Sequence, residues 1–197
     1  MRKYLKLINR GLILFLVLIM GVAIYLAVQN QEARKIRPEL EKTAEEFVAE
    51  AAKLVVMPES LRLLPYEGFY ESDALNQHIG DQSDKLSIYY SDNEAIREYS
   101  SMWLSMSFST QYSESVFILS SQPKIVKFDN FSVYKGKATL TFSIEDTMTL
   151  LMPDGEEQTE GMYGRLETIT FIKEGNRWVI NSYESSRLSS DLWQNNW

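Results

Sequence analysis

The chain has no cysteine, and its 197 residues include a single histidine, His78. The absence of cysteine excludes disulfides, thiolate nucleophiles, cysteine zinc sites and a lipid-modified cysteine anchor. A single imidazole excludes every two-histidine metal motif. The chain also lacks a phosphate-binding glycine loop, a nucleophile elbow and an internal repeat. The acidic residues Asp81, Asp84 and Asp92 do not have the spacing of a calcium loop, so we expect no metal and no cofactor.

Charged residues are missing from one long segment near the N-terminus. Residues 11–28, GLILFLVLIMGVAIYLAV, are long enough and apolar enough to cross a bilayer as one helix. The four basic residues ahead of this segment predict a cytoplasmic N-terminus and an extracytoplasmic remainder, although basic residues also follow it at positions 34, 35 and 37. A cleaved signal peptide is the alternative, but the apolar run is long and no small-residue cleavage site follows it. The prediction is an uncleaved signal-anchor in a single-pass protein of the cell membrane.

Positive charge is scarce in the rest of the chain. Without the basic residues at positions 2, 3, 6 and 10, the remaining 16 Lys and Arg face 27 Asp and Glu, a formal charge of −11. This acidity argues against nucleic acid and against an anionic membrane surface as partners of the domain.

Helical periodicity dominates the first half of the domain. Pro38 suits the first turn of a helix that begins anew near Arg37 and packs on its own domain. Residues 37–56 carry apolar side chains at three- and four-residue steps, at Leu40, Ala44, Phe47, Val48, Ala51, Leu54 and Val55. A short helix is expected near 72–79. Ser91 and Glu94 form a capping pattern for a further helix, whose apolar stripe is Ile96, Tyr99, Met102, Trp103 and Met106.

From Val116 onward the apolar period changes to two. Ala138, Leu140, Phe142 and Ile144 alternate with polar residues, which is typical of a half-buried strand. Turn signals at 135–136, 153–155 and 174–176 predict an antiparallel meander of about four strands. The predicted divisions are a basic cytoplasmic end at 1–10, a transmembrane helix at 11–28, a linker at 29–36, an extracytoplasmic domain at 37–184 and a C-terminal tail at 185–197.

The order of elements, helices followed by a curled antiparallel sheet that ends in KEGNRWVINSYE, resembles the NTF2-like superfamily of cone-shaped α+β domains. The matching residues of the last hairpin are Lys173, Gly175, Trp178 and Ile180. The resemblance implies an α+β fold in which amphipathic helices pack on the sheet, with Trp178 buried and Phe142 and Ile144 facing the helix. Membrane-anchored members of the superfamily include VirB8-type components of bacterial secretion machines, and only the architecture is similar to theirs.

Many members of that superfamily hold a pocket inside the cone. Asp146 follows Ile144 in the row of inward-facing positions that could line such a pocket. With Phe142 and Met148 beside it, a buried Asp146 would have a raised pKa and act as a base. The alternative, which we favour, is a bulge at 145–146 that turns the carboxylate outward. His78 is interpreted as a surface residue of a polar loop, with a pH switch as the alternative. The aromatic residues at 89–112 are expected in the core, with a ligand pocket as the alternative.

The tail holds Leu192, Trp193 and Trp197 among polar residues. It either docks on its own domain or binds a protein partner, because Trp is frequent at interfaces. Three functions remain open, in this order: a non-catalytic membrane-anchored scaffold of a cell-envelope complex, a ligand-binding or sensing module, and a small-molecule lyase or isomerase. The expected partners are the membrane and envelope proteins, a homo-oligomer included.

Overall fold

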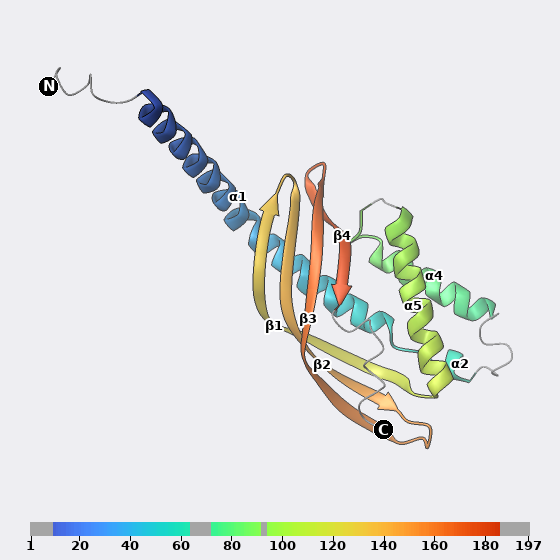
Figure 1. The fold of residues 1–197 in the computed structure, drawn as a ribbon. Helices are drawn as coiled ribbons and strands as arrows, with labels where there is room; N and C mark the ends of the chain where they lie inside the picture. The colour runs from blue at the N-terminus through green and yellow to red at the C-terminus, as the bar shows by residue number, and fades with distance from the viewer. Residues whose placement is uncertain (1–9, 64–71, 92–93, 186–197) are drawn as a thin grey trace. The chain divides into compact units, whose positions relative to one another are not determined.

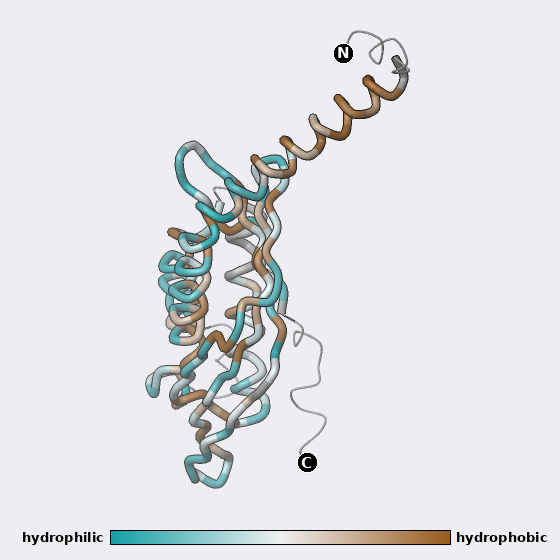
Figure 2. The backbone as a smooth tube through the Cα atoms, turned by 90° about the vertical axis from the view of Figure 1, so that its left-hand side faces the viewer, coloured by the Kyte–Doolittle hydropathy of each residue, from teal (hydrophilic) through white to brown (hydrophobic). Residues whose placement is uncertain are grey.

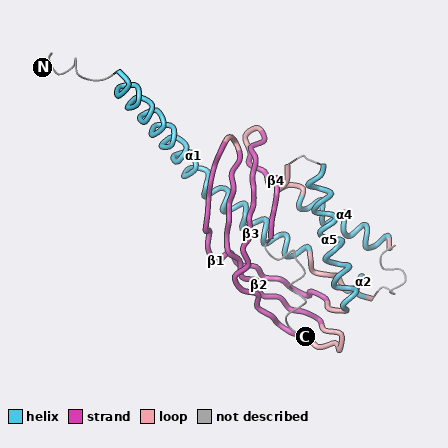
Figure 3. Tube along the Cα trace, in the orientation of Figure 1, coloured by secondary structure: helices cyan, strands magenta, loops and turns pink. Residues whose placement is uncertain are grey.

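The structure is a computed structural model that describes residues 10–63, 72–91 and 94–185. It has α+β architecture, as predicted, with four helices and four strands among the described residues (Figures 1 and 3). The helices are α1 (Arg10–Leu54), α2 (Glu59–Arg62), α4 (Asp73–Leu86) and α5 (Glu94–Glu114), and the strands are β1 (Phe117–Tyr134), β2 (Lys137–Leu151), β3 (Glu157–Glu174) and β4 (Arg177–Ser185). The chain divides into two compact units, Met1–Pro38 and Glu39–Trp197.

The first unit holds the apolar part of α1. Its large apolar side chains from Leu12 to Val28 are each about half exposed or more, and Figure 2 shows this stretch as hydrophobic throughout. A helix that is apolar on all sides finds its low-energy environment in lipid. The described chain therefore has one helix long and apolar enough to cross a membrane.

The predicted helix start near Arg37 is wrong. Helix α1 continues through residues 29–36, which were predicted as a linker, and contains Pro38 in its interior. Residues 29–36 are mostly good helix formers, and this favours continuation although Pro38 removes one backbone hydrogen bond. The division between the two units nevertheless falls at this proline.

The second unit begins with the amphipathic part of α1. The predicted apolar stripe is confirmed, because six of its seven residues are buried: Leu40, Ala44, Phe47, Val48, Ala51 and Leu54. The predicted short helix is α4, which extends seven residues beyond Ile79 because Gly80 does not interrupt it.

The predicted helix is confirmed as α5, but its predicted apolar stripe is not the buried side. Met102 and Met106 are 54% and 61% exposed, whereas Leu104 and Phe108 are fully buried. Residues 92–93 lie outside the described residues, and so do the side chains of Ile96 and Tyr99. The core-facing side of the described part of α5 is therefore rotated away from the predicted one.

The buried amide of Gln111 joins three elements. Its Nε2 donates to the Val55 carbonyl at 2.9 Å, and its Oε1 accepts from the Ile118 amide at 2.8 Å. The first contact satisfies a backbone carbonyl at the end of α1, and the second satisfies the start of β1. Gln111 thus fixes the end of α1 and the start of β1 against α5.

The sheet is an antiparallel meander of order β1-β2-β3-β4. The predicted alternation in β2 is confirmed, since Ala138, Leu140, Phe142 and Ile144 are at most 1% exposed while the residues between them are half-buried. At the first hairpin, Lys135 and Gly136 have φ of 48° and 73°, the backbone of a type I′ turn.

The strands bend midway along their length, where Figure 1 shows β1, β2 and β3 changing direction together. The pairing of β2 with β3 shifts between Ile144 and Asp146, where β3 carries one extra residue. Gly164 in this segment has φ of +70°, a conformation that favours glycine. The bulge divides the sheet into a four-stranded part that includes β4 and a three-stranded arm beyond the bend.

Trp178 is half-buried, so the prediction that it lies in the core is wrong. It pairs with Lys173 close to the hairpin turn, at the rim of the sheet. Phe171 and Ile180 of this hairpin pair with each other, and both are fully buried.

The packing predicts different costs for two truncations in this hairpin. Phe171→Ala should lower the free energy of unfolding by about 3–5 kcal/mol, because it removes a fully buried ring from the core. Trp178→Ala should cost clearly less, because the indole is half-buried. Urea unfolding of both variants measures the difference. A larger loss for Trp178→Ala would contradict the register of the hairpin.

Candidate functional site

The face of the sheet that carries the buried apolar side chains is called the inner face. Cross-strand rows on it include Ala138–Phe171–Ile180 and Leu140–Ile169–Tyr183. Three charged side chains interrupt this apolar surface: Asp146 on β2, and Arg165 and Glu167 on β3. Buried charges require partners, and these three residues are therefore the first place to look for a site.

Asp146 stays on the inner face at the bend. It is 7% exposed, and the Ser121 hydroxyl on β1 lies 3.0 and 2.9 Å from its two carboxylate oxygens. The favoured prediction, a bulge that turns Asp146 outward, is wrong because the extra residue lies in β3 and leaves the alternation of β2 intact. The hydroxyl of Ser121 satisfies the carboxylate within the fold.

The other two residues of the predicted pocket lie in different parts of the sheet. Phe142 is fully buried, and its ring contacts Phe128 edge-on at 6.0 Å between centroids. Met148 is beyond the bend, where it packs against a small cluster in the arm made of Val116, Leu150 and Met152. Asp146 lies between them on the same strand.

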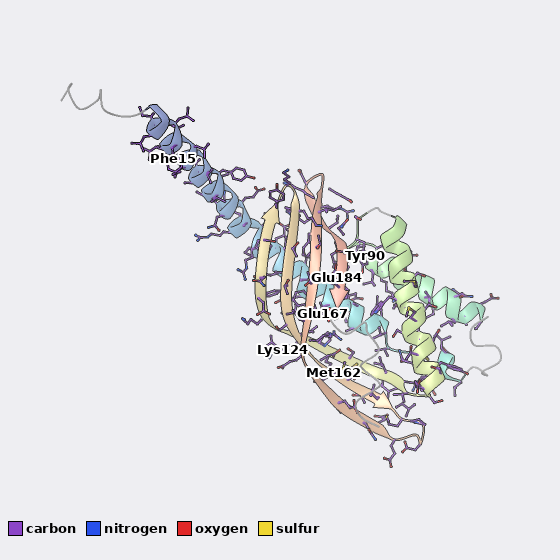
Figure 4. All side chains as sticks on the ribbon, in the orientation of Figure 1. Phe15, Tyr90, Lys124, Met162, Glu167 and Glu184 are labelled. Carbon is purple, nitrogen blue, oxygen red and sulfur yellow. The ribbon has the colours of Figure 1, made fainter. Side chains whose placement is uncertain are left out.

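The most deeply buried charge, Glu167, was not predicted. Glu167, labelled on β3 in Figure 4, is 0% exposed. It occupies the cross-strand row of Phe142 and forms an ion pair with Arg165. A hydrogen bond also joins its carboxylate to the Tyr183 phenol. The sequence signal for this ion pair lies in YGRLETIT, where Arg165 and Glu167 are two residues apart and therefore share one face of the strand.

Desolvation, together with the Glu167 carboxylate, raises the pKa of Tyr183 well above its ordinary value. Tyr183 therefore stays protonated and donates to Glu167. The Glu167 carboxylate is paired with a guanidinium and a phenol, and its role is therefore to stabilise the fold.

The aromatic ring of Phe47 covers this cluster from α1. It meets Tyr89, Tyr90 and Tyr183 edge-on, with centroids 5.8, 5.7 and 5.2 Å away. Tyr90 is bridged to β4, where the Ser91 amide donates to the Ile180 carbonyl and the Ile180 amide donates to the Tyr89 carbonyl. The described aromatics of 89–112 thus contribute to the core, as predicted for Tyr90 and Phe108.

His78 lies on α4 and not in a polar loop. Its half-buried ring is 5.4 Å from that of Phe108, and its Nε2 is 3.4 Å from the Gln82 amide nitrogen. Burial and the charge of Lys85 lower its pKa, while Asp81 opposes this shift. His78 is therefore a packing residue between α4 and α5. The described residues contain no group of three His, Asp or Glu able to hold a metal ion.

The tail residues Leu192, Trp193 and Trp197 lie outside the described residues, so their predicted role stays a prediction.

Comparisons with known proteins identify no family. No family model and no curated protein matches the chain. Among solved structures, the chain is similar to the intermembrane space region of chloroplast protein ARC6, at 11% identity and a TM-score of 0.37, over 73% of this chain and 94% of that one. The described elements themselves define the class of protein, an α+β domain that follows a helix long and apolar enough to span a membrane.

The raised pKa of Tyr183 predicts a pH-dependent effect of Tyr183→Phe. At pH 7 the loss of a hydrogen bond to a buried carboxylate should lower the free energy of unfolding by about 1.5–3 kcal/mol. Above pH 10 the Tyr183 phenol loses its proton in the unfolded wild-type chain but keeps it in the folded chain. The wild type therefore loses stability as pH rises, and the difference in unfolding free energy between wild type and variant narrows. Tyr134→Phe, at an exposed tyrosine, is the control. Urea unfolding between pH 7 and 11 measures the gap, and a constant or widening gap would contradict the assignment.

Proposed function

We propose that this protein is a non-catalytic, membrane-anchored scaffold of a bacterial cell-envelope complex. The observation that carries the proposal is the exposed apolar half of α1, which is continuous with a helix whose second half lies in the core of a folded domain. The anchor and the fold share one helix, so the domain begins close to the membrane along the chain.

The proposed orientation is a cytoplasmic N-terminus and an extracytoplasmic domain. Four basic residues precede the apolar segment and no acidic residue does, which supports this orientation. The proposed divisions are those expected from the sequence, with the domain beginning at 37–39 in place of a separate linker.

The inner face supports a structural role for its charged residues. Asp146 is hydrogen-bonded to Ser121, and Glu167 is paired with Arg165 and Tyr183. A general base needs a carboxylate that faces its substrate, whereas these carboxylates face partners within the fold. We propose that the domain is NTF2-like and that its membrane-anchored architecture is similar to that of VirB8-type domains.

The partner-binding element that we propose is the tail, through Leu192, Trp193 and Trp197. Tryptophan buries a large area at low entropic cost, which makes it frequent at interfaces. Confinement of the domain to a membrane plane raises the effective concentration of its partners, so a short segment suffices to hold them.

Removal of residues 189–197 tests the scaffold. The truncated chain should keep the unfolding midpoint of the full chain but lose the proteins that co-purify with it from detergent extracts. A second variant keeps the full length but replaces Trp193 and Trp197 by Ala, and it should lose the same partners. If either chain retains every partner, the tail is not the contact; if the truncated chain unfolds, the tail belongs to the core.

A further inference from the structure

All the sulfur in the chain belongs to methionine, because the chain has eight methionines and no cysteine. Where a cysteine thiolate is present, it is the sulfur group that oxidants attack first. In its absence, two-electron oxidants such as peroxides act on the methionine thioether and convert it to the sulfoxide. The response of this chain to such oxidants therefore depends on which thioethers they reach.

Most of the described methionines are withdrawn from water. Met57 is 1% exposed and Met152 is 9% exposed. Met148 and Met162 are half-buried on the sheet, and Met148 packs against the small cluster of the arm. Met20 lies in the apolar segment of α1, which a membrane would surround. A dissolved oxidant therefore has limited access to these thioethers.

Met102 and Met106 on α5 are the exception. They are 54% and 61% exposed, and because they lie four residues apart they share one side of the helix. Leu104 and Phe108 are fully buried and supply contacts of α5 with the core. The two methionines are thus accessible to water, and they lie outside the buried core.

Exposure also decides what oxidation does to the fold. A sulfoxide at Met57 would place a polar oxygen among buried apolar side chains, and a buried polar group without a hydrogen bond is destabilising. A sulfoxide at Met102 or Met106 can be hydrated, because each residue is more than half exposed. The pair on α5 can therefore be oxidised while the domain stays folded.

We propose that Met102 and Met106 form a reversible oxidation site for peroxides. The sulfur lone pair attacks one peroxide oxygen, the O–O bond breaks and an S–O bond forms. With hydrogen peroxide, the sulfur loses two electrons and the second oxygen leaves as water. A sulfoxide reductase reverses the step with two thiols, which become a disulfide, and the sulfoxide oxygen leaves as water. Oxidation thus changes the exposed side of α5 from an apolar to a polar surface without changing its buried side.

Mass spectrometry of the full chain in native membranes tests the selectivity. During a titration with hydrogen peroxide, Met102 and Met106 should gain oxygen at least about tenfold faster than Met57 and Met152, because the rate follows exposure. Peptide fragmentation assigns each oxygen to a methionine and separates it from oxidised Trp103. The chain unfolded in urea, where all four thioethers are exposed, is the control. Equal rates in the folded chain, or faster oxidation of Met57, would overturn the proposal.

A double variant tests the position of the site. Met102→Leu with Met106→Leu keeps the apolar character and nearly the volume of both side chains but removes their sulfur. At peroxide doses that modify only the α5 pair of the wild type, this variant should take up at most about a tenth of the wild-type oxygen. Uptake equal to that of the wild type would place the site elsewhere.

The stability of the oxidised chain tests reversibility. The oxidised wild type should keep the urea midpoint of the untreated chain, and reductases for both sulfoxide epimers should restore its mass. A lowered midpoint, or sulfoxides that the reductases leave in place on the folded chain, would contradict the proposal. None of these measurements involves the tail or the co-purifying partners, so failure of this proposal leaves the scaffold standing.

Discussion

The ring of Phe47 is the contact on which most of the domain depends. It lies on the buried side of α1 and meets Tyr89 and Tyr90 at the β4 edge and Tyr183 on β4 itself. Edge-on aromatic contacts add about 0.5–1.5 kcal/mol each beyond the burial of area. Through Tyr183 the same cluster reaches the buried Glu167 and its ion pair with Arg165. Phe47 thus joins α1, the β4 edge and the charged residues of the inner face.

Much of the fold follows from local pattern. The alternation of β2, the turn residues of the hairpins and the apolar stripe of residues 40–54 each determine their element within a few residues, and the structure confirms them. Trp178 and Asp146 were placed wrongly because their surroundings depend on pairing between strands. Trp178 lies at the rim because its partner is Lys173, and Asp146 stays inside because the extra residue is in β3.

Local sequence pattern also could not predict which side of α5 faces the core. Met102 and Met106 repeat at helical spacing just as Leu104 and Phe108 do, and no charged residue lies between positions 101 and 113 to mark the outer side. Only the packing of α5 on the domain decides between the two sets. Such ambiguity arises when a helix has two apolar sides, and here the structure shows Leu104 and Phe108 in the core and Met102 and Met106 at the surface.

The interior and the surface have separate roles in this account. Buried charges on the inner face are paired with one another or with hydroxyl groups, which stabilises one arrangement of the bent sheet. In the proposed scaffold, the tail binds the partner proteins. In the proposed scaffold, the membrane anchor strengthens weak contacts by confining the domain and its partners to a plane.

The orientation of the chain in the membrane tests this account most directly. Single cysteines at Lys3 and at the exposed Thr147 can be labelled with a membrane-impermeant maleimide in intact spheroplasts, because the chain has no other thiol. The account predicts labelling of Thr147→Cys in intact spheroplasts and of Lys3→Cys only after lysis. Labelling of Lys3→Cys before lysis, with Thr147→Cys protected, would contradict it.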